Sequence, residues 1–306
     1  MNSPTALITG AHGFIGRYTA RYFSRQGWNV VGIGLGSWTP DEHAEWGITD
    51  WHEATIDVES ILNCGVKPNA VVHCAGSGSV GYSVASPYDD FLMNVETAAA
   101  MLEYVRRYAP DAAVVAISSA AVYGAAKQLP IPEVAPLAPV SPYGFHKMMM
   151  ETLCASYSSN FGLRTAIVRL FSIYGNGLRK QLLWDACNKV SKGATDFNGN
   201  GTEVRDWLHV EDAVRLLYAA ADHASDEAPV VNGGTGVGTS IRDVLQELFR
   251  VLGKSDPPRF IGAPRPGDPD SLVADYSRAK SWNWTPGINW RSGVREYAEW
   301  FNNLRQ

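Results

Sequence analysis

The sequence predicts an α/β protein with a doubly wound parallel sheet, followed by a smaller and less regular C-terminal region. Short apolar runs recur along the first part of the chain, at 6–9, 28–34, 69–76, 112–119 and 164–171. Such runs are typical of parallel strands that are buried on both faces. Segments with helical periodicity, such as 14–24 and 94–108, separate the runs, which is the alternation that this fold class requires.

Composition limits what the protein can bind. The chain has 306 residues, of which 45% are apolar and 19% charged, so it can bury a large core as one big domain or two modest ones. The net charge is −5 and no run of Lys or Arg stands out, so we expect no nucleic acid or membrane partner. A small molecule is the expected ligand.

The cysteines and the apolar runs indicate the compartment. The four cysteines form no CxxC pair and have no histidine at ligand spacing, so we expect reduced thiols and no metal site. The first residues carry no basic segment before a long apolar one, and no apolar run approaches the roughly 18 residues that a membrane helix needs. We therefore expect a cytoplasmic protein.

Three glycines occupy the turn between the first predicted strand and the first predicted helix. Gly10, Gly13 and Gly16 can serve, in order, a tight turn, a close backbone approach to a pyrophosphate, and close helix-to-strand packing. The N-terminus of the helix then faces the phosphates. The spacing is GxxGxxG and not GxGxxG, and a glycine-rich turn without a ligand is the alternative.

A tyrosine and a lysine lie four residues apart in the stretch VSPYGFHKMMME, residues 140–151. Ser141 and Pro142 suit the N-cap and first position of a helix, so Tyr143 and Lys147 would share one helix face. An adjacent ammonium and a cationic nicotinamide would lower the pKa of the phenol, which is ordinarily near 10. Tyr143 could then exchange a proton; an exposed pair with a modest packing role is the alternative.

The combination of these motifs resembles the extended branch of the short-chain dehydrogenase/reductase superfamily. The glycine turn, a strand that ends in Ser118 and Ser119, and the Tyr143-xxx-Lys147 pair occur in the order of that superfamily. The resemblance covers the whole chain and is closest to the NAD-dependent nucleotide-sugar epimerases and dehydratases of the UDP-galactose 4-epimerase type. The segments that carry it are 71–98, 118–124, 169–175, 205–213 and 265–280.

The resemblance implies an architecture and a set of ligands. It implies a Rossmann-type NAD-binding domain over residues 1–174, to which 208–236 returns, and a nucleotide-sugar-binding region over 175–306. The cofactor would be NAD, the substrate a nucleotide-diphosphate sugar, and the assembly a homodimer. Tyr123 lacks a lysine four residues on and is expected to be structural.

The resemblance also implies residue roles. Ser119 would hydrogen-bond the sugar oxygen that becomes a carbonyl, Tyr143 would be the acid/base, and Lys147 would hold the nicotinamide ribose and tune Tyr143. The implied cofactor contacts are Gly10, Gly13, Phe14, Ile15, Gly16, Asp57, Val58, Ala75, Asn94, Ser118, Tyr143 and Lys147. The implied substrate contacts are Ser119, Ser172, Arg205 and Arg265, whose two arginines would grip the diphosphate.

Three departures from the family pattern shape the expected reaction. Gly34 stands where an acidic residue usually holds the adenosine ribose, and Ser172 stands where many relatives have an asparagine. Ala120 and Ala121 follow Ser119 where 4,6-dehydratases carry an Asp-Glu pair. Without that acid and base we expect a 4-epimerase. A 4-keto-sugar reductase using NAD(P)H and a non-catalytic nucleotide-binding module remain alternatives, while a metal-dependent hydrolase lacks a ligand cluster.

The segment around the second strand favours NAD over NADP. It contains no lysine or arginine from Gln26 to Val66. A 2′-phosphate would therefore meet no cation from this segment and several anions. The acidic residues of the segment are Asp41, Glu42, Glu45, Asp50, Glu53, Asp57 and Glu59.

Overall fold

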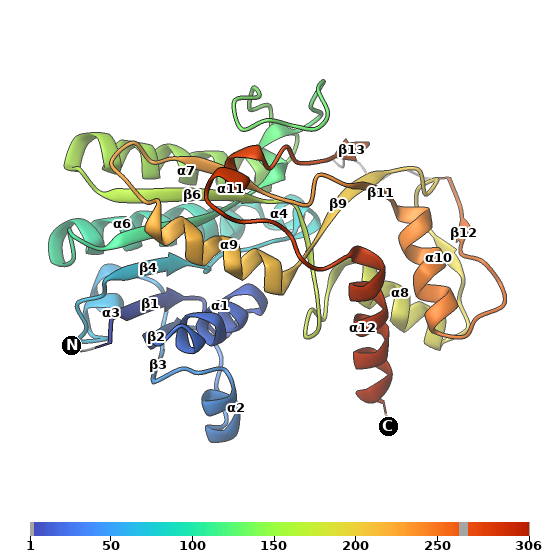
Figure 1. The fold of residues 1–306 in the computed structure, drawn as a ribbon, viewed down its shortest axis with the longest axis horizontal. Helices are drawn as coiled ribbons and strands as arrows, with labels where there is room; N and C mark the ends of the chain where they lie inside the picture. Colours follow the sequence, from blue (N-terminus) through green and yellow to red (C-terminus); the bar gives the residue numbers. More distant parts are fainter. Residues whose placement is uncertain (1–2, 263–268, 306) are drawn as a thin grey trace.

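The computed structural model describes residues 3–262 and 269–305, and its main element is a seven-stranded sheet (Figure 1). All neighbouring strands in this sheet are parallel, in the order β10-β6-β5-β4-β1-β2-β3. The strands are β1 (Thr5–Thr9), β2 (Asn29–Gly34), β3 (Asp50–Glu53), β4 (Ala70–His73), β5 (Ala113–Ser119), β6 (Arg164–Leu170) and β10 (Val230–Gly233). The predicted doubly wound α/β fold is confirmed.

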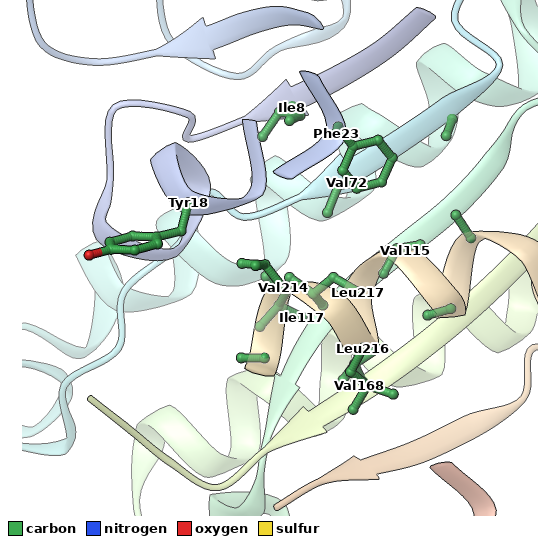
Figure 2. Close-up of a cluster of buried hydrophobic side chains, with 14 of the residues drawn as sticks. Ile8, Tyr18, Phe23, Val72, Val115, Ile117, Val168, Val214, Leu216 and Leu217 are labelled. Atoms are coloured by element: carbon green, nitrogen blue, oxygen red, sulfur yellow. The ribbon is translucent and has the colours of Figure 1, made fainter. Parts of the chain in front are cut away.

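Helices cover both faces of the sheet, which explains the nearly continuous apolar strands. Ile8 and Val72 face α1 and α9, and Figure 2 shows them in one cluster with Phe23 of α1 and Leu217 of α9. On the other face, Leu7 packs in a second core with residues of α3, α6 and α7. The helices are α1 (Phe14–Arg25), α3 (Val58–Leu62), α6 (Thr97–Tyr108), α7 (Pro142–Phe161) and α9 (Val210–Asp222).

The sequence analysis did not find β3, and the predicted helix over 94–108 begins differently. β3 is an edge strand whose four residues are all exposed or half-buried, so it contains no apolar run. The first turn of the helix is the π-helical turn η1 (Leu92–Glu96), after which α6 continues in α-helical geometry. A π-helical turn changes which side chains face a neighbouring element, and such turns are frequent at functional sites.

Part of the chain after residue 174 packs on the main sheet. α9 lies against α1, and β10 extends the sheet beyond β6. The short helix α11 (Ser277–Ser281) contacts β10, and the buried Trp284 donates its indole N–H to the carbonyl of Asp212 in α9 at 3.0 Å. The C-terminal region is therefore joined to the main sheet at several points along the chain.

The remaining C-terminal elements form a smaller unit with its own core. Figure 1 shows α8, α10 and α12 grouped beyond one end of the main sheet. Their buried side chains pack around Tyr174, Leu245 and Tyr297. The unit contains β7 (Ser172–Tyr174), β9 (Val204–His209), β11 (Gly238–Ser240) and β13 (Ser271–Leu272), with α8 (Gln181–Ser191), α10 (Ile241–Val251) and α12 (Trp290–Asn303).

Short elements complete the described chain. They are α2 (Pro40–Glu45), α4 (Val80–Ala85), α5 (Pro87–Phe91), the 3-10 helix η2 (Ala120–Tyr123), β8 (Asp196–Phe197) and β12 (Arg259–Phe260). All four cysteines are free thiols. Among the described residues, no group of three or more His, Cys, Asp or Glu side chains could hold a metal ion, and no helix is long and apolar enough to cross a membrane.

Candidate active site

The glycine turn after β1 brings backbone segments so close together that side chains at Gly10 and Gly16 would collide with them. A Cβ on Gly10 would lie 2.7 Å from the backbone of Ala75, and one on Gly16 would lie 2.1 Å from the carbonyl oxygen of Gly10. Gly13 is the N-cap of α1 and provides no side-chain cap for its first N–H groups. A pyrophosphate can accept hydrogen bonds from such groups, so the turn fits a dinucleotide.

Several other expected cofactor residues lie along the carboxyl edge of the sheet. Phe14 and Ile15 form the first turn of α1, and Ala75 follows β4 with its N–H donating to Oγ1 of Thr9 at 3.3 Å. Asp57 is the N-cap of α3, where its carboxylate accepts the N–H of Ser60 at 2.8 Å. Bonds from Ser60 lower the pKa of that carboxyl. Val58 is the first residue of the same helix.

The three expected catalytic residues meet at the carboxyl end of β5. Ser141 caps α7 by accepting the N–H of Gly144 at 3.2 Å, which confirms the predicted helix start. Tyr143, in the first turn of α7, lies close enough to Ser119, the last residue of β5, for the Ser119 side chain to lower its pKa. Ser119 also accepts the N–H of Ala121 at 3.2 Å, so its oxygen is held while its proton can be donated.

Burial determines the protonation of the Tyr143 and Lys147 pair. It raises the pKa of Tyr143, and the Ser119 side chain only partly opposes this effect. In the chain by itself Lys147 does not offset this effect, because burial disfavours the phenolate and the ammonium donates to the Ile117 carbonyl at 2.9 Å; the lowering expected from Lys147 together with the nicotinamide stays a prediction. Burial likewise lowers the pKa of Lys147 to about 8, against the opposing charge of Asp90.

Asn94 and Lys147 flank a position suited to a hydroxylated ligand. Asn94 lies in η1, where its Nδ2 donates to the carbonyl of Asp90 at 3.0 Å. Its Oδ1 is buried and has no hydrogen-bond partner among the described residues. A Cβ on Gly76 would lie 2.7 Å from this oxygen and 3.5 Å from Nζ of Lys147. A buried acceptor beside an ammonium fits the hydroxyl groups of a ribose.

Sequence reasoning did not identify a buried hydrogen-bonded pair beside the first turn of the catalytic helix. Asp90 is fully buried, and its Oδ2 lies 2.6 Å from Nδ1 of His146, the residue before Lys147. The negative charge of Asp90 raises the pKa of both Tyr143 and Lys147. The partners are 56 residues apart in the chain, so no local pattern joins them.

Ser118 faces away from this site and into a buried polar network. Its hydroxyl donates to Glu151, whose carboxylate accepts two hydrogen bonds from Arg169, at 2.9 and 2.7 Å. Arg169 also donates to the hydroxyl of Tyr123 at 2.9 Å, and that hydroxyl donates to Oδ1 of Asn232 at 2.7 Å. These contacts give Tyr123 the structural role that we expected. Because the Ser118 hydroxyl is bonded to Glu151, only the backbone of Ser118 can contact a cofactor.

Two of the four expected substrate residues lie on the small C-terminal sheet. Ser172 is in β7 and Arg205 is in β9, and these strands are paired. Arg205 is buried, and its Nη1 donates to the carbonyls of Val204 at 2.8 Å and Asp270 at 3.4 Å. Arg265 lies outside the described residues. A cleft of about 390 Å³ adjoins this sheet and is lined by Asn200, Thr202, Glu203, Gly262, Asp270 and Ser271.

Comparison with known proteins gives a consistent result along the chain. Residues 6–234 match the model of the NAD dependent epimerase/dehydratase family. The chain is 31% identical to the UDP-glucose 4-epimerase of Azospirillum brasilense, over 99% of this chain and 94% of that protein. It is 28% identical to the UDP-glucose 4-epimerase of Bacillus subtilis (strain 168), over 90% of this chain and 89% of that protein.

Solved structures show the same similarity. A UDP-glucose 4-epimerase with UDP-glucose from Thermotoga maritima superimposes with a TM-score of 0.89 at 26% identity, covering 99% of this chain and 100% of the other. MoeE5 in complex with UDP-glucose and NAD superimposes with a TM-score of 0.87 at 27% identity, covering 99% of this chain and 100% of the other.

Proposed function

Because this chain belongs to the NAD dependent epimerase/dehydratase family, we propose that it is an NAD-dependent nucleotide-sugar 4-epimerase that acts through a transient 4-keto sugar. The observation that carries the proposal is the meeting of Ser119 and Tyr143 at the end of β5, with Lys147 one helical turn further along α7. The relatives named as UDP-glucose 4-epimerases support a UDP-hexose as the substrate.

The chain's own residues move one proton in each direction. Tyr143 takes the proton of the C4 hydroxyl, and Ser119 donates a hydrogen bond to the same oxygen, because its own oxygen is held by the Ala121 N–H. NAD, when bound, supplies reversible hydride transfer at C4. After the keto sugar has presented its other face, Tyr143 returns the proton to O4. The sugar leaves with its C4 configuration inverted, and no cofactor is consumed overall.

The proposed cofactor site uses the carboxyl edge of the sheet. The backbone of the turn from Gly10 to Gly16 holds the pyrophosphate, and Asp57 and Val58 lie at the adenine end. Asn94 and Lys147 hold the nicotinamide ribose, which gives the buried Oδ1 of Asn94 a donor. Ser172 and Arg205 are proposed to contact the nucleotide sugar from the smaller unit.

Two alanines argue against a dehydratase. Loss of the C6 hydroxyl requires one group to remove the C5 proton and another to protonate the leaving oxygen. Ala120 and Ala121 follow Ser119 in η2 and can do neither. The absence of an acid and a base at these two positions therefore favours return of hydride to C4.

The activity test supplies catalytic NAD and UDP-glucose, then follows C4 configuration by NMR together with the absorbance of reduced cofactor. We expect UDP-galactose to form while no reduced cofactor accumulates. Consumption of one NADH for each 4-keto sugar that is reduced would instead establish a reductase. A parallel panel of UDP-, GDP-, CDP- and dTDP-sugars identifies the nucleotide and the sugar.

We also propose a homodimer and a cytoplasmic location. η1 and α7 pack together and expose large apolar side chains at Met93, Phe145 and Met149, which a second copy could cover. The four free cysteines suit a reducing compartment. Light scattering coupled to gel filtration tests the assembly, and a mass of one chain would contradict the dimer.

A further inference from the structure

The acidic residue that ordinarily holds the adenosine ribose is missing from β2. In dinucleotide-binding folds this residue lies about 20 positions after the glycine turn and accepts the ribose 2′-hydroxyl. Gly34 ends β2 here, and a Cβ on it would lie 3.2 Å from Cα of Gly10. The preceding carbonyl, that of Ile33, accepts the N–H of Gly10 at 2.7 Å. The end of β2 therefore lies directly against the glycine turn and carries no carboxylate.

The adjacent strand places a carboxylate at the same edge. β3 pairs in parallel with β2, with Glu53 opposite Gly34 in the register. Glu53 is the last residue of β3 and therefore lies at the carboxyl edge of the sheet, where ligands of such sheets bind. Its Oε2 accepts the hydroxyl of Ser37, in the segment that follows β2, at 2.9 Å. Glu53 is thus hydrogen-bonded to the loop that follows Gly34.

We infer that Glu53 replaces the missing acidic residue: it accepts the 2′-hydroxyl of the adenosine ribose and excludes a 2′-phosphate. This inference rests on the proposed function, because it concerns the NAD of that site. A carboxylate accepts a hydroxyl proton readily, whereas two anionic groups in contact repel one another. Glu53 would then be the residue that sets the preference for NAD over NADP.

Two basic side chains, His12 and Arg17, lie near this edge. The His12 ring lies against Gly36, where a Cβ would be 2.3 Å from its Nδ1, and burial together with the charge of Arg17 lowers the pKa of the ring, which disfavours the imidazolium. Arg17 donates to the carbonyl of His12 at 2.7 Å, and its guanidinium lies 5.1 Å from the Trp38 ring centre and 5.3 Å from that of Trp46. The Arg17 guanidinium is thus held by the His12 carbonyl and the two rings, and its buried Nε has no hydrogen-bond partner among the described residues.

The test measures binding of NAD and NADP to the cofactor-free full chain by calorimetry, without turnover. We expect wild type to prefer NAD, and Glu53→Gln to lower the ratio of the NADP to the NAD dissociation constant by about tenfold or more. Glu53→Lys should lower the ratio further, because it replaces the repelling charge with an attracting one. The matched control is Asp50→Asn, an equal charge change at the other end of β3, which should leave the ratio within about twofold.

The outcomes separate this inference from the proposed function. A ratio within about twofold of wild type in both Glu53 variants, with NAD still bound, would overturn the role of Glu53 alone. If wild type bound neither cofactor, the proposed function itself would fail. Glu53 is exposed, so both variants should keep the thermal midpoint of wild type. Trp51, which lies beside Gly34, gives a fluorescence signal as a second binding readout.

Discussion

Tyr143 shows how burial and chemistry interact at a single residue. Burial raises the pKa of its phenol, and among the described residues Ser119 provides the one interaction that lowers it. A general base works best when its pKa is near the working pH. The positive charge of the nicotinamide ring supplies an opposing effect. The tyrosine is therefore expected to become an effective base only in the complex with the oxidised cofactor.

Removing the Tyr143 hydroxyl should abolish most turnover and leave the fold intact. We expect Tyr143→Phe to lower kcat by at least about 10²–10⁴, because proton transfer by a positioned group is worth that much. NAD affinity, measured by calorimetry, should change little. The matched control is Tyr123→Phe, which removes a hydroxyl bonded to Arg169 and Asn232 and should lower stability more than kcat. Near-normal turnover of Tyr143→Phe would refute the assignment.

The buried amine of Lys147 should make stability depend on pH. Its pKa is lowered from 10.5 to about 8, mainly by burial, so between these pH values the unfolded chain binds more protons than the folded one. Stability attributable to Lys147 therefore rises as pH increases from about 8 to 10.5, and below about 8 the burial penalty is constant. Asp90 and Glu151 are the carboxylates whose charge opposes the shift.

The measurement compares wild type with Lys147→Met by urea denaturation at several pH values. Relative to the variant, the free energy of unfolding of wild type should rise by about 2–4 kcal/mol across that interval. Effects of other titrating groups largely cancel in the difference between the two proteins. Parallel pH dependences would show that the amine is not held at a lowered pKa.

At the level of elements, a buried ion pair fastens the catalytic helix to the sheet. Glu151 of α7 and Arg169 of β6 are only 6% and 4% exposed, and they form a bidentate salt bridge. Glu151 lies one turn beyond Lys147 and also accepts the hydroxyl of Ser118, which precedes Ser119. The pair therefore holds the end of β5 and the start of α7 in a fixed relation.

Removing one partner of this pair should lower the free energy of unfolding more than removing both partners. We expect Arg169→Leu to lower the free energy of unfolding by about 3–5 kcal/mol, because it leaves the Glu151 carboxylate buried without its partner. The double variant Glu151→Leu with Arg169→Leu should lose less than Arg169→Leu alone. Chemical denaturation of the three proteins measures this order. A double variant less stable than the single one would contradict it.

At the scale of the whole molecule, the dinucleotide-binding part is not a continuous piece of chain. β10 completes the sheet beside β6, and α9 covers Val115 and Val168 through Leu217 and Leu216 (Figure 2). We therefore propose that the segment 1–174 needs 208–236, and also the stretch around Trp284, to bury its core.

A fragment of residues 1–174 should fail to fold by itself. It lacks β10 and α9, so one edge of the sheet is unpaired and much of one face is exposed to water. We expect no cooperative thermal unfolding by circular dichroism and strong binding of a hydrophobic dye, with the full chain as the control. A cooperative transition together with NAD binding by the fragment would show that residues 1–174 fold independently.

The sequence by itself determined the features that depend on neighbours in the chain. Strands buried on both faces appear as apolar runs, the helix start at Ser141 follows from its capping side chain, and the glycine turn follows from spacing. Tyr143 and Lys147 share a helix face because 3.6 residues make one turn. The roles of these residues came from the family resemblance, because spacing alone cannot separate a catalytic pair from an exposed one.

Only the tertiary structure decided what depends on distant segments. The pairing of Asp90 with His146, and the position of Glu53 opposite Gly34, depend on helix packing and strand register. β3 left no apolar pattern because it lies at an exposed edge. Burial raises the pKa of Tyr143 in the chain by itself, an effect that the Tyr143–Lys147 spacing cannot reveal, because desolvation depends on every segment that surrounds a side chain.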